Sequence, residues 1–136
     1  MEFENENGDT LELSLISWEF PNDKWIMVRI KCKNERGSWE GVDPSLTESE
    51  VTKLSKWLVS GGSRPDSSID FLEPELEFRF VSGMLQIYLE FKYRPPWAPS
   101  DFQSGDNYFY MEFNVSDEIL SNASENLILE LMAIPG

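Results

Sequence analysis

Carboxylates are the side chains of this sequence that could support catalysis, because the chain contains no histidine and a single cysteine. Without imidazole, histidine-based triads, histidine general bases and zinc sites built on histidine are excluded. Two carboxyl groups held across a substrate suffice for glycoside hydrolysis. A carboxylate-dependent enzyme such as a glycosidase therefore stays open as an alternative, provided that two Asp or Glu side chains converge in a cleft.

The nearest approach to such a pair is the alternating series Glu73, Glu75 and Glu77. If this stretch is extended, the three acids share one face of a strand, opposite the apolar Leu76 and Phe78. Acids on the water-facing side of a strand most often form a solvated edge, and we expect that here. No spacing of acids matches a calcium loop and no glycine pattern matches a nucleotide loop, so we predict no catalytic residue, metal or cofactor.

The net charge of −14 comes from the two ends of the chain. Residues 1–23 carry seven Asp or Glu and residues 95–136 carry seven more, with no Lys or Arg in either segment. Residues 24–94 hold eleven charges of each sign. Direct binding to DNA or RNA needs clustered Lys and Arg, so it is disfavoured. The acidic ends can serve solubility alone, or they can attract a basic partner.

Two tyrosines near the end of the chain are candidates for partner binding. In the run NYFYMEF, Tyr108, Tyr110 and Glu112 alternate with apolar residues and so share the outer face of a strand. With Asp101 and Asp106 from the preceding loop they would form a contact face, because tyrosine offers large contact area at low entropic cost. The pattern by itself favours a tyrosine pair covered by a helix, as is common for sheets in α+β domains. Both interpretations stay open, and these five residues are the predicted partner-binding set.

Apolar residues that alternate at period two predict a sheet-rich fold. The pattern recurs at residues 11–15, 26–32, 76–80, 85–91 and 109–115. Turn sequences between the runs, such as Asn7-Gly8 and Ser82-Gly83, indicate short hairpins and therefore antiparallel neighbours. We expect about seven to eight strands, mostly in antiparallel sheet.

Two helices complete the predicted fold. A central helix at about 47–60 has Thr47 as N-cap, with Glu50 completing a capping box. A C-terminal helix at about 116–132 opens at Ser116, although the stretch NLILELMAI within the last residues of the chain could instead form a strand. The predicted class is therefore α+β, and a length of 136 residues fits one domain that spans residues 1–136.

Several features favour the cytoplasm. The first residues, MEFENENGD, are acidic where a secretory signal peptide needs basic and then apolar residues, and no later run approaches a membrane span. The lone Cys32 excludes an internal disulfide and is compatible with a reducing compartment. Because Cys32 alternates with apolar residues in its strand, we expect a buried, inert thiol.

The motifs GSWEGVDPSLTESEVTKLSKWL, FLEPELEF and YRPPW occur in this order along the chain. Read together, they resemble the WapI-type immunity proteins of bacterial polymorphic and contact-dependent toxin systems. The resemblance spans most of the chain. The residues that carry it, which we expect to be structural, are Trp39, Glu40, Asp43, Pro44, Trp57, Glu73, Pro74, Arg94, Pro95, Pro96 and Trp97.

The resemblance implies a cytoplasmic protein without enzymatic activity that binds and neutralises the toxic C-terminal domain of a cognate secreted or surface protein. Such toxins include RNA-cleaving enzymes, and an acidic inhibitor that covers a basic active site would fit the charge of this chain. The alternative is a non-catalytic module for a small molecule or a host factor, which a pocket lined with aromatic residues would favour.

The segment RPPWAPS, residues 94–100, lies between two predicted strands. Pro95 and Pro96 restrict the residues before them to extended conformations, so the chain leaves the strand in a stiff direction. The segment is a poor SH3 ligand, because Trp97 stands where a second proline step would be needed. We expect a structural loop that packs Trp97 against the domain.

Overall fold

The computed structural model describes residues 1–61, 66–98 and 108–135. Within these ranges the chain forms eight β-strands, two α-helices and one short 3-10 helix. The strands make two four-stranded sheets in which all neighbours are antiparallel. The predicted α+β class, mostly antiparallel sheet with a central and a C-terminal helix, is confirmed.

The first sheet is built from consecutive strands. Its order is β1 (Glu2–Glu4), β2 (Thr10–Trp18), β3 (Trp25–Asn34) and β4 (Gly37–Thr47). Buried and more exposed residues alternate along β2 and β3, because successive side chains of a strand point to opposite faces. The period-two pattern of the sequence thus identifies the inner face of this sheet.

The second sheet also follows chain order. It contains β5 (Asp66–Asp70), β6 (Leu76–Val81), β7 (Met84–Leu89) and β8 (Tyr110–Asn114). Ser82 and Gly83, which join β6 to β7, both have positive φ, 52° and 81°. Two successive positive φ angles are typical of the type I′ turn, whose twist matches a tight hairpin. Strand β8 is an edge of this sheet.

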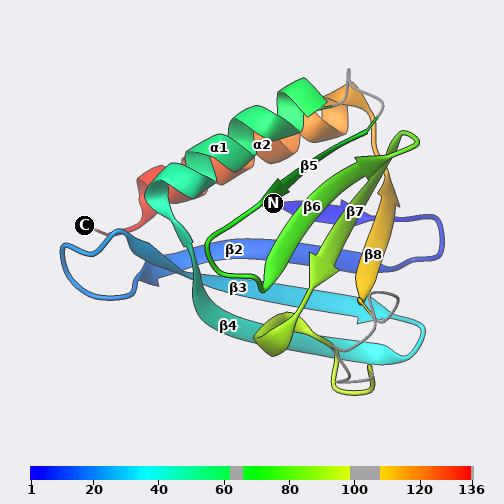
Figure 1. Ribbon diagram of the computed structural model, residues 1–136, viewed down its shortest axis with the longest axis horizontal. Helices are drawn as coiled ribbons and strands as arrows, with labels where there is room; N and C mark the ends of the chain where they lie inside the picture. Colours follow the sequence, from blue (N-terminus) through cyan, green and yellow to red (C-terminus); the bar gives the residue numbers. More distant parts are fainter. Residues whose placement is uncertain (62–65, 99–107, 136) are drawn as a thin grey trace.

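Figure 1 shows the strands of the second sheet running across those of the first, with the two helices together along one side. Helix α1 (Glu48–Gly61) connects β4 to β5, and α2 (Asp117–Ala133) follows β8. Among the described residues, inward-facing apolar side chains from both sheets and both helices form a core cluster. The helices therefore contribute to the same core that the two sheets enclose.

The start of α1 has the capping box expected from its sequence. The N–H of Glu50 donates to Thr47 Oγ1 at 3.2 Å, and the N–H of Thr47 donates to Glu50 Oε1 at 3.0 Å. Leu46 and Val51 are fully buried on either side of the cap, as in a hydrophobic staple. The second carboxylate oxygen of Glu50 accepts from the N–H of Leu72 at 2.8 Å, which ties the segment before β6 to this helix.

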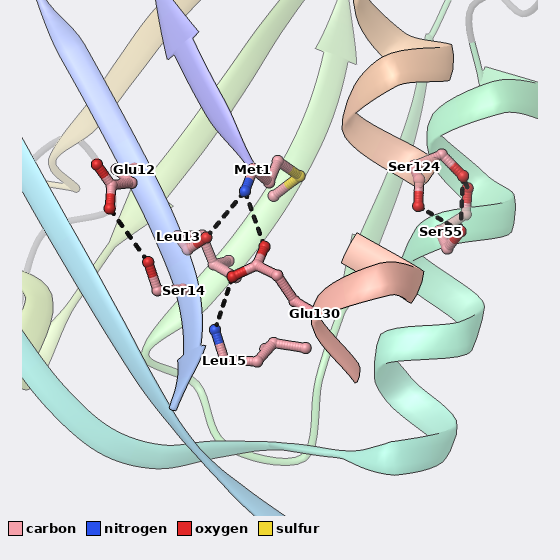
Figure 2. Close-up of polar contacts among 8 residues, drawn as sticks. All are labelled: Met1, Glu12, Leu13, Ser14, Leu15, Ser55, Ser124 and Glu130. Carbon is pink, nitrogen blue, oxygen red and sulfur yellow. Dashed lines mark hydrogen bonds and ion pairs between the residues drawn. The ribbon is translucent and has the colours of Figure 1, made fainter. Parts of the chain in front are cut away.

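Helix α2 continues to Ala133, so residues 127–133 are helical and do not form a strand. Ser116 caps the helix by accepting from the N–H of Ile119 at 3.2 Å. The hydroxyl groups of Ser55 and Ser124 lie 2.6 Å apart in the buried contact between the two helices, which Figure 2 shows. The prediction of a second helix at about 116–132 is confirmed.

Glu130 connects α2 to the first sheet (Figure 2). One carboxylate oxygen pairs with the amino group of Met1 at 2.9 Å, and the other accepts from the N–H of Leu15 at 3.2 Å. Pairing between β1 and β2 covers only residues 10–12 of β2, so Leu15 lies beyond the reach of β1. Glu130 therefore supplies an acceptor that a neighbouring strand would otherwise provide.

The alternating pattern at residues 85–91 predicts a strand that is two residues longer than the observed strand β7. Strand β7 ends at Leu89, and Phe91 begins the 3-10 helix η1 (Phe91–Tyr93) with φ of 52°. Phe91 is 55% exposed, so it does not share the buried face of Leu85, Ile87 and Leu89.

Among the described residues, no helix combines the length and the apolar character needed to cross a lipid bilayer.

Candidate functional site

Three of the five predicted contact residues, Tyr108, Tyr110 and Glu112, lie on the outer face of the second sheet. Tyr110 is the first residue of the edge strand β8 and is 45% exposed. Tyr108 lies two residues before the strand and is 49% exposed. The alternative in which a helix covers this tyrosine pair is therefore wrong. Glu112 is half-buried two residues further along the same face. Asp101 and Asp106 lie outside the described residues.

Residues on neighbouring strands extend this face. Tyr88 is the register partner of both Tyr110 and Glu77, so their side chains point the same way. The rings of Tyr88 and Tyr110 lie 5.0 Å apart, and the Arg79 guanidinium lies 4.3 Å from the centre of the Tyr88 ring. Arg79 also forms an ion pair with Glu77. These contacts hold the aromatic rings in place before any partner arrives.

A second row of polar contacts orients Glu112. Gln86 is its register partner and donates from Nε2 to Glu112 Oε2 at 2.7 Å. The Tyr88 hydroxyl in turn donates to Gln86 Oε1 at 3.0 Å. Burial raises the pKa of Tyr88, so its hydroxyl remains a donor at neutral pH. The sequence could not reveal Arg79, Gln86 and Tyr88 as part of this face, because the pairing register between strands is not encoded in any one run.

The two acidic ends of the chain meet beside this face. A hollow of about 300 Å³ lies between the turn that follows β1 and the edge of β8. Glu6 and Asp9 line it from the first acidic segment, and Glu112 lines it from the last. Within the part of the chain that the structure describes, no residue of the lining is Lys or Arg. The side-chain amide of Asn5 donates to the backbone oxygen of Glu112 at 3.1 Å across the same junction. Figure 1 shows the turn after β1 close to β8.

Motif residues surround the short helix η1. The Trp39 indole donates to the backbone oxygen of Tyr93 at 3.0 Å, and the Tyr93 hydroxyl donates to the backbone oxygen of Val28 at 2.9 Å. A Cβ at Gly41 would overlap the carbonyl oxygen of Lys92, so η1 can lie this close to β4 only because residue 41 is glycine. Tyr93 is fully buried, and the sequence pattern did not indicate it.

The proline segment anchors the chain after η1. The Arg94 guanidinium forms a buried ion pair with Glu90 at 2.7 Å. Pro95 is buried and Pro96 is exposed. Trp97 packs edge-on against Trp39, with ring centres 5.0 Å apart, in agreement with the structural loop expected for this segment.

Trp39 also contacts Phe109 in the same edge-on manner, with ring centres 5.6 Å apart. Phe109 directly precedes β8, so one indole ring contacts the chain both at the end of the proline segment and at the entry to the edge strand. The motif residues therefore help to position the face that carries Tyr108 and Tyr110.

Glu75 is buried and does not lie on a solvated edge, because β6 begins only at Leu76. It is 4% exposed, and both of its carboxyl oxygens are inaccessible to solvent. Burial raises its pKa to about 8, with a further contribution from the neighbouring Asp43 carboxylate. Lys92 pairs with Asp43 at 3.4 Å. The two acids converge, but Glu75 is closed to a substrate.

The remaining motif residues have scaffold contacts or lie at the surface. Trp57 of α1 stacks on Phe80 of β6, with ring centres 4.5 Å apart. Pro44 lies at a register shift between β3 and β4, a position where a missing N–H is tolerated. Glu40 and Pro74 are exposed, and Glu73 is half-buried.

Comparison with known proteins gives one match. A family model described as the immunity protein WapI-like family matches residues 2–135, nearly the whole chain. Neither the curated proteins nor the solved structures contain a significant match.

Proposed function

The chain belongs to the immunity protein WapI-like family, and we propose that it neutralises a cognate protein toxin by binding the toxin domain and covering its active site. The protein acts in the cytoplasm, where it meets the toxin before the toxin meets its substrate. It makes and breaks no covalent bond and uses no cofactor. RNA-cleaving toxins are the class that fits best, because their active sites are basic in order to hold phosphate.

The meeting of Glu6, Asp9 and Glu112 beside the exposed tyrosines is the observation that carries this proposal. Carboxylates gathered on one surface accelerate encounter with a basic partner and repel nucleic acid. The tyrosines supply contact area, and their neighbours on β6 and β7 hold them in one arrangement. Asp101 and Asp106 belong to the same proposed face by their position in the sequence.

The two alternatives from the sequence are less well supported. A glycosidase would need its carboxyl pair in a cleft, whereas Glu75 of the Asp43–Glu75 pair is closed to solvent. A small-molecule site would need a largely apolar pocket. The hollow beside β8 includes Phe109 and Tyr110, but it is lined mainly by carboxylate and asparagine side chains. A second hollow of about 570 Å³, at the turn between β2 and β3, does include Trp18 and Phe20, together with three carboxylates.

The proposal predicts that a long secreted protein with a variable C-terminal domain is encoded beside this gene. That domain, called the toxin domain below, is the partner for the test. Co-expression should restore growth of cells that produce the toxin domain, and the two proteins should co-purify. Replacing Tyr108 and Tyr110 by Ala should weaken binding by about tenfold or more, as expected for aromatic contact residues.

Phe20→Ala is the matched control, because Phe20 is an exposed aromatic residue on the turn between β2 and β3. It should bind like the unaltered protein. Failure of the chain to restore growth, or equal weakening by Phe20→Ala, would contradict the proposal.

A further inference from the structure

We propose that the free edge of β8 receives an extended, basic segment of the toxin domain as an added strand of the second sheet. This inference rests on the proposed function and specifies how the partner is held. Strand addition uses main-chain hydrogen bonds for affinity and alternate side chains for specificity.

The direction of the backbone groups on β8 follows from its pairing with β7. The N–H of Leu89 donates to the oxygen of Phe109 at 3.1 Å, so these two residues form a hydrogen-bonded pair. In an antiparallel ladder hydrogen-bonded and non-hydrogen-bonded pairs alternate. Met111 and Phe113 therefore direct their N–H and C=O groups toward β7.

The backbone N–H and C=O groups of Tyr110, Glu112 and Asn114 therefore point away from β7. The contact between Asn5 and the backbone oxygen of Glu112 confirms this orientation, because the amide approaches β8 from the outer side. Within residues 1–61, 66–98 and 108–135, the N–H groups of Tyr110 and Glu112 pair with no backbone oxygen. Unpaired groups of this kind are a template for another strand.

The hollow runs along this edge. Tyr110, Glu112 and Asn114 line one side of it, and Glu6 and Asp9 line the other. A segment in the hollow would lie between Glu112 of β8 and the two carboxylates of Glu6 and Asp9, and no described residue of the lining is Lys or Arg. Such a segment must therefore bring positive charge of its own. The side chain of Asn5 occupies one acceptor on this edge, the backbone oxygen of Glu112. A pairing strand can replace this hydrogen bond with one of its own.

Strand β4, one of the two edges of the first sheet, is less suited to this role. The helix η1 crosses it so closely that a Cβ at Gly41 would overlap the carbonyl oxygen of Lys92. Trp39 of the same strand bonds to the backbone of Tyr93. An added strand would have to displace these contacts, whereas at β8 it would enter a hollow that already exists.

Amide hydrogen exchange, followed by NMR on the labelled protein with and without the toxin domain, tests the inference. The N–H groups of Tyr110 and Glu112 should exchange quickly in the free protein. In the complex their exchange rates should fall by a factor of about ten or more. Those of Met111 and Phe113 already bond to β7 and should be slow in both states. Alternating protection distinguishes backbone pairing from contact through side chains alone.

A pair of variants at Glu112 gives an independent measurement. Glu112→Ala and Glu112→Pro both remove the carboxylate, but only proline removes the outward N–H, and proline is tolerated at edge positions whose N–H faces outward. The proline variant should bind the toxin domain about tenfold more weakly than the alanine variant. Thermal melts establish that both variants are folded, and if the proline variant is not, the exchange pattern decides.

The outcomes separate this inference from the proposed function. If the toxin domain binds and is neutralised, but Tyr110 and Glu112 exchange as in the free protein, strand addition is wrong and the immunity function stands. Equal affinities of two folded Glu112 variants would also overturn strand addition. If no complex forms at all, the proposed function itself is wrong.

Discussion

The carboxyl group of Glu75 lies in a cluster of ionisable side chains beneath η1. Asp43 approaches it from β4, Lys92 pairs with Asp43 from η1, and Glu73 adds negative charge from the preceding loop. Burial is the largest cause that raises the pKa of Glu75 from 4.5 to about 8. At neutral pH the carboxyl group of Glu75 is therefore mainly protonated and uncharged.

This environment predicts a pH-dependent stability. Between about pH 4.5 and about pH 8, Glu75 binds more protons in the folded protein than in the unfolded chain. Its contribution to the free energy of unfolding therefore falls as the pH rises through this window. Glu75→Gln keeps the shape of the side chain and cannot ionise. Relative to the unaltered protein, the variant should gain stability steadily from about pH 5 to about pH 8 in urea denaturation.

Glu77→Gln serves as the control, since Glu77 is partly exposed and paired with Arg79. The free energy of unfolding of this variant should not rise relative to that of the unaltered protein between about pH 5 and about pH 8. Parallel stability curves for Glu75→Gln and the unaltered protein would show that Glu75 is ionised in the fold at neutral pH.

Single side chains were predictable only where one strand sufficed. Alternation within 109–115 predicts that Tyr110 points outward and Phe113 inward, and both do. The burial of Glu75 depends on where β6 begins and on what covers the residue before it. Alternation through Leu76 and Phe78 cannot locate that boundary. The sequence pattern therefore predicted, wrongly, that the side chain of Glu75 is exposed to solvent.

At the scale of elements, the best-defined local signal is the start of α1. Replacing Thr47 by Ala removes a cap in which the N–H of Glu50 finds its acceptor. The free energy of unfolding should fall by about 1 kcal/mol, the usual value for a lost N-cap. Chemical denaturation measures this difference directly.

Thr52→Ala is the matched control, because Thr52 lies within the same helix and its hydroxyl bonds only to a backbone oxygen at an exposed site. Its effect should be within about 0.5 kcal/mol of zero. Equal losses for the two variants would mean that the capping box contributes nothing beyond the removal of a threonine.

Elements were predictable where their patterns were complete. Helix α1 has a full cap, and β2, β3, β6 and β8 have clean alternation. Strand β4 contains Pro44 beside a register shift, which breaks its alternation, and β1 is only three residues long. Strand β5, with the sequence DSSID, offers too few apolar residues for any periodic pattern.

At the scale of the whole molecule, the charge distribution predicts how the partner is found. Reversing Glu6 and Glu112 together to Lys should slow association with the toxin domain by about tenfold at low salt, because steering depends on the field around the site. The difference should shrink as the Debye length falls from about 10 Å at 0.1 M to about 3 Å at 1 M salt. Stopped-flow association rates measure both effects.

The paired variant Glu19→Lys with Glu125→Lys changes the net charge equally and lies outside the hollow. Its association rate should be affected less. Identical rates for the two double variants at every salt concentration would mean that only the total charge matters, and that the acidic junction beside β8 has no special role.

The sequence located the negative charge but not its convergence. The composition of residues 1–23 and 95–136 predicts two acidic segments. Their meeting requires that the turn after β1 of one sheet lie against β8, the edge of the other. No local pattern encodes a contact between edges of different sheets, so this part of the candidate site came only from the three-dimensional arrangement.

The indole of Trp39 touches both Trp97 and Phe109, which flank residues 98–108 in the sequence. Trp97 and Phe109 are therefore fixed against one aromatic ring, although they are twelve positions apart in the sequence. Connections between such fixed points tolerate changes in length and composition at little thermodynamic cost. We therefore expect insertions and substitutions between Trp97 and Phe109 to leave the stability of both sheets nearly unchanged.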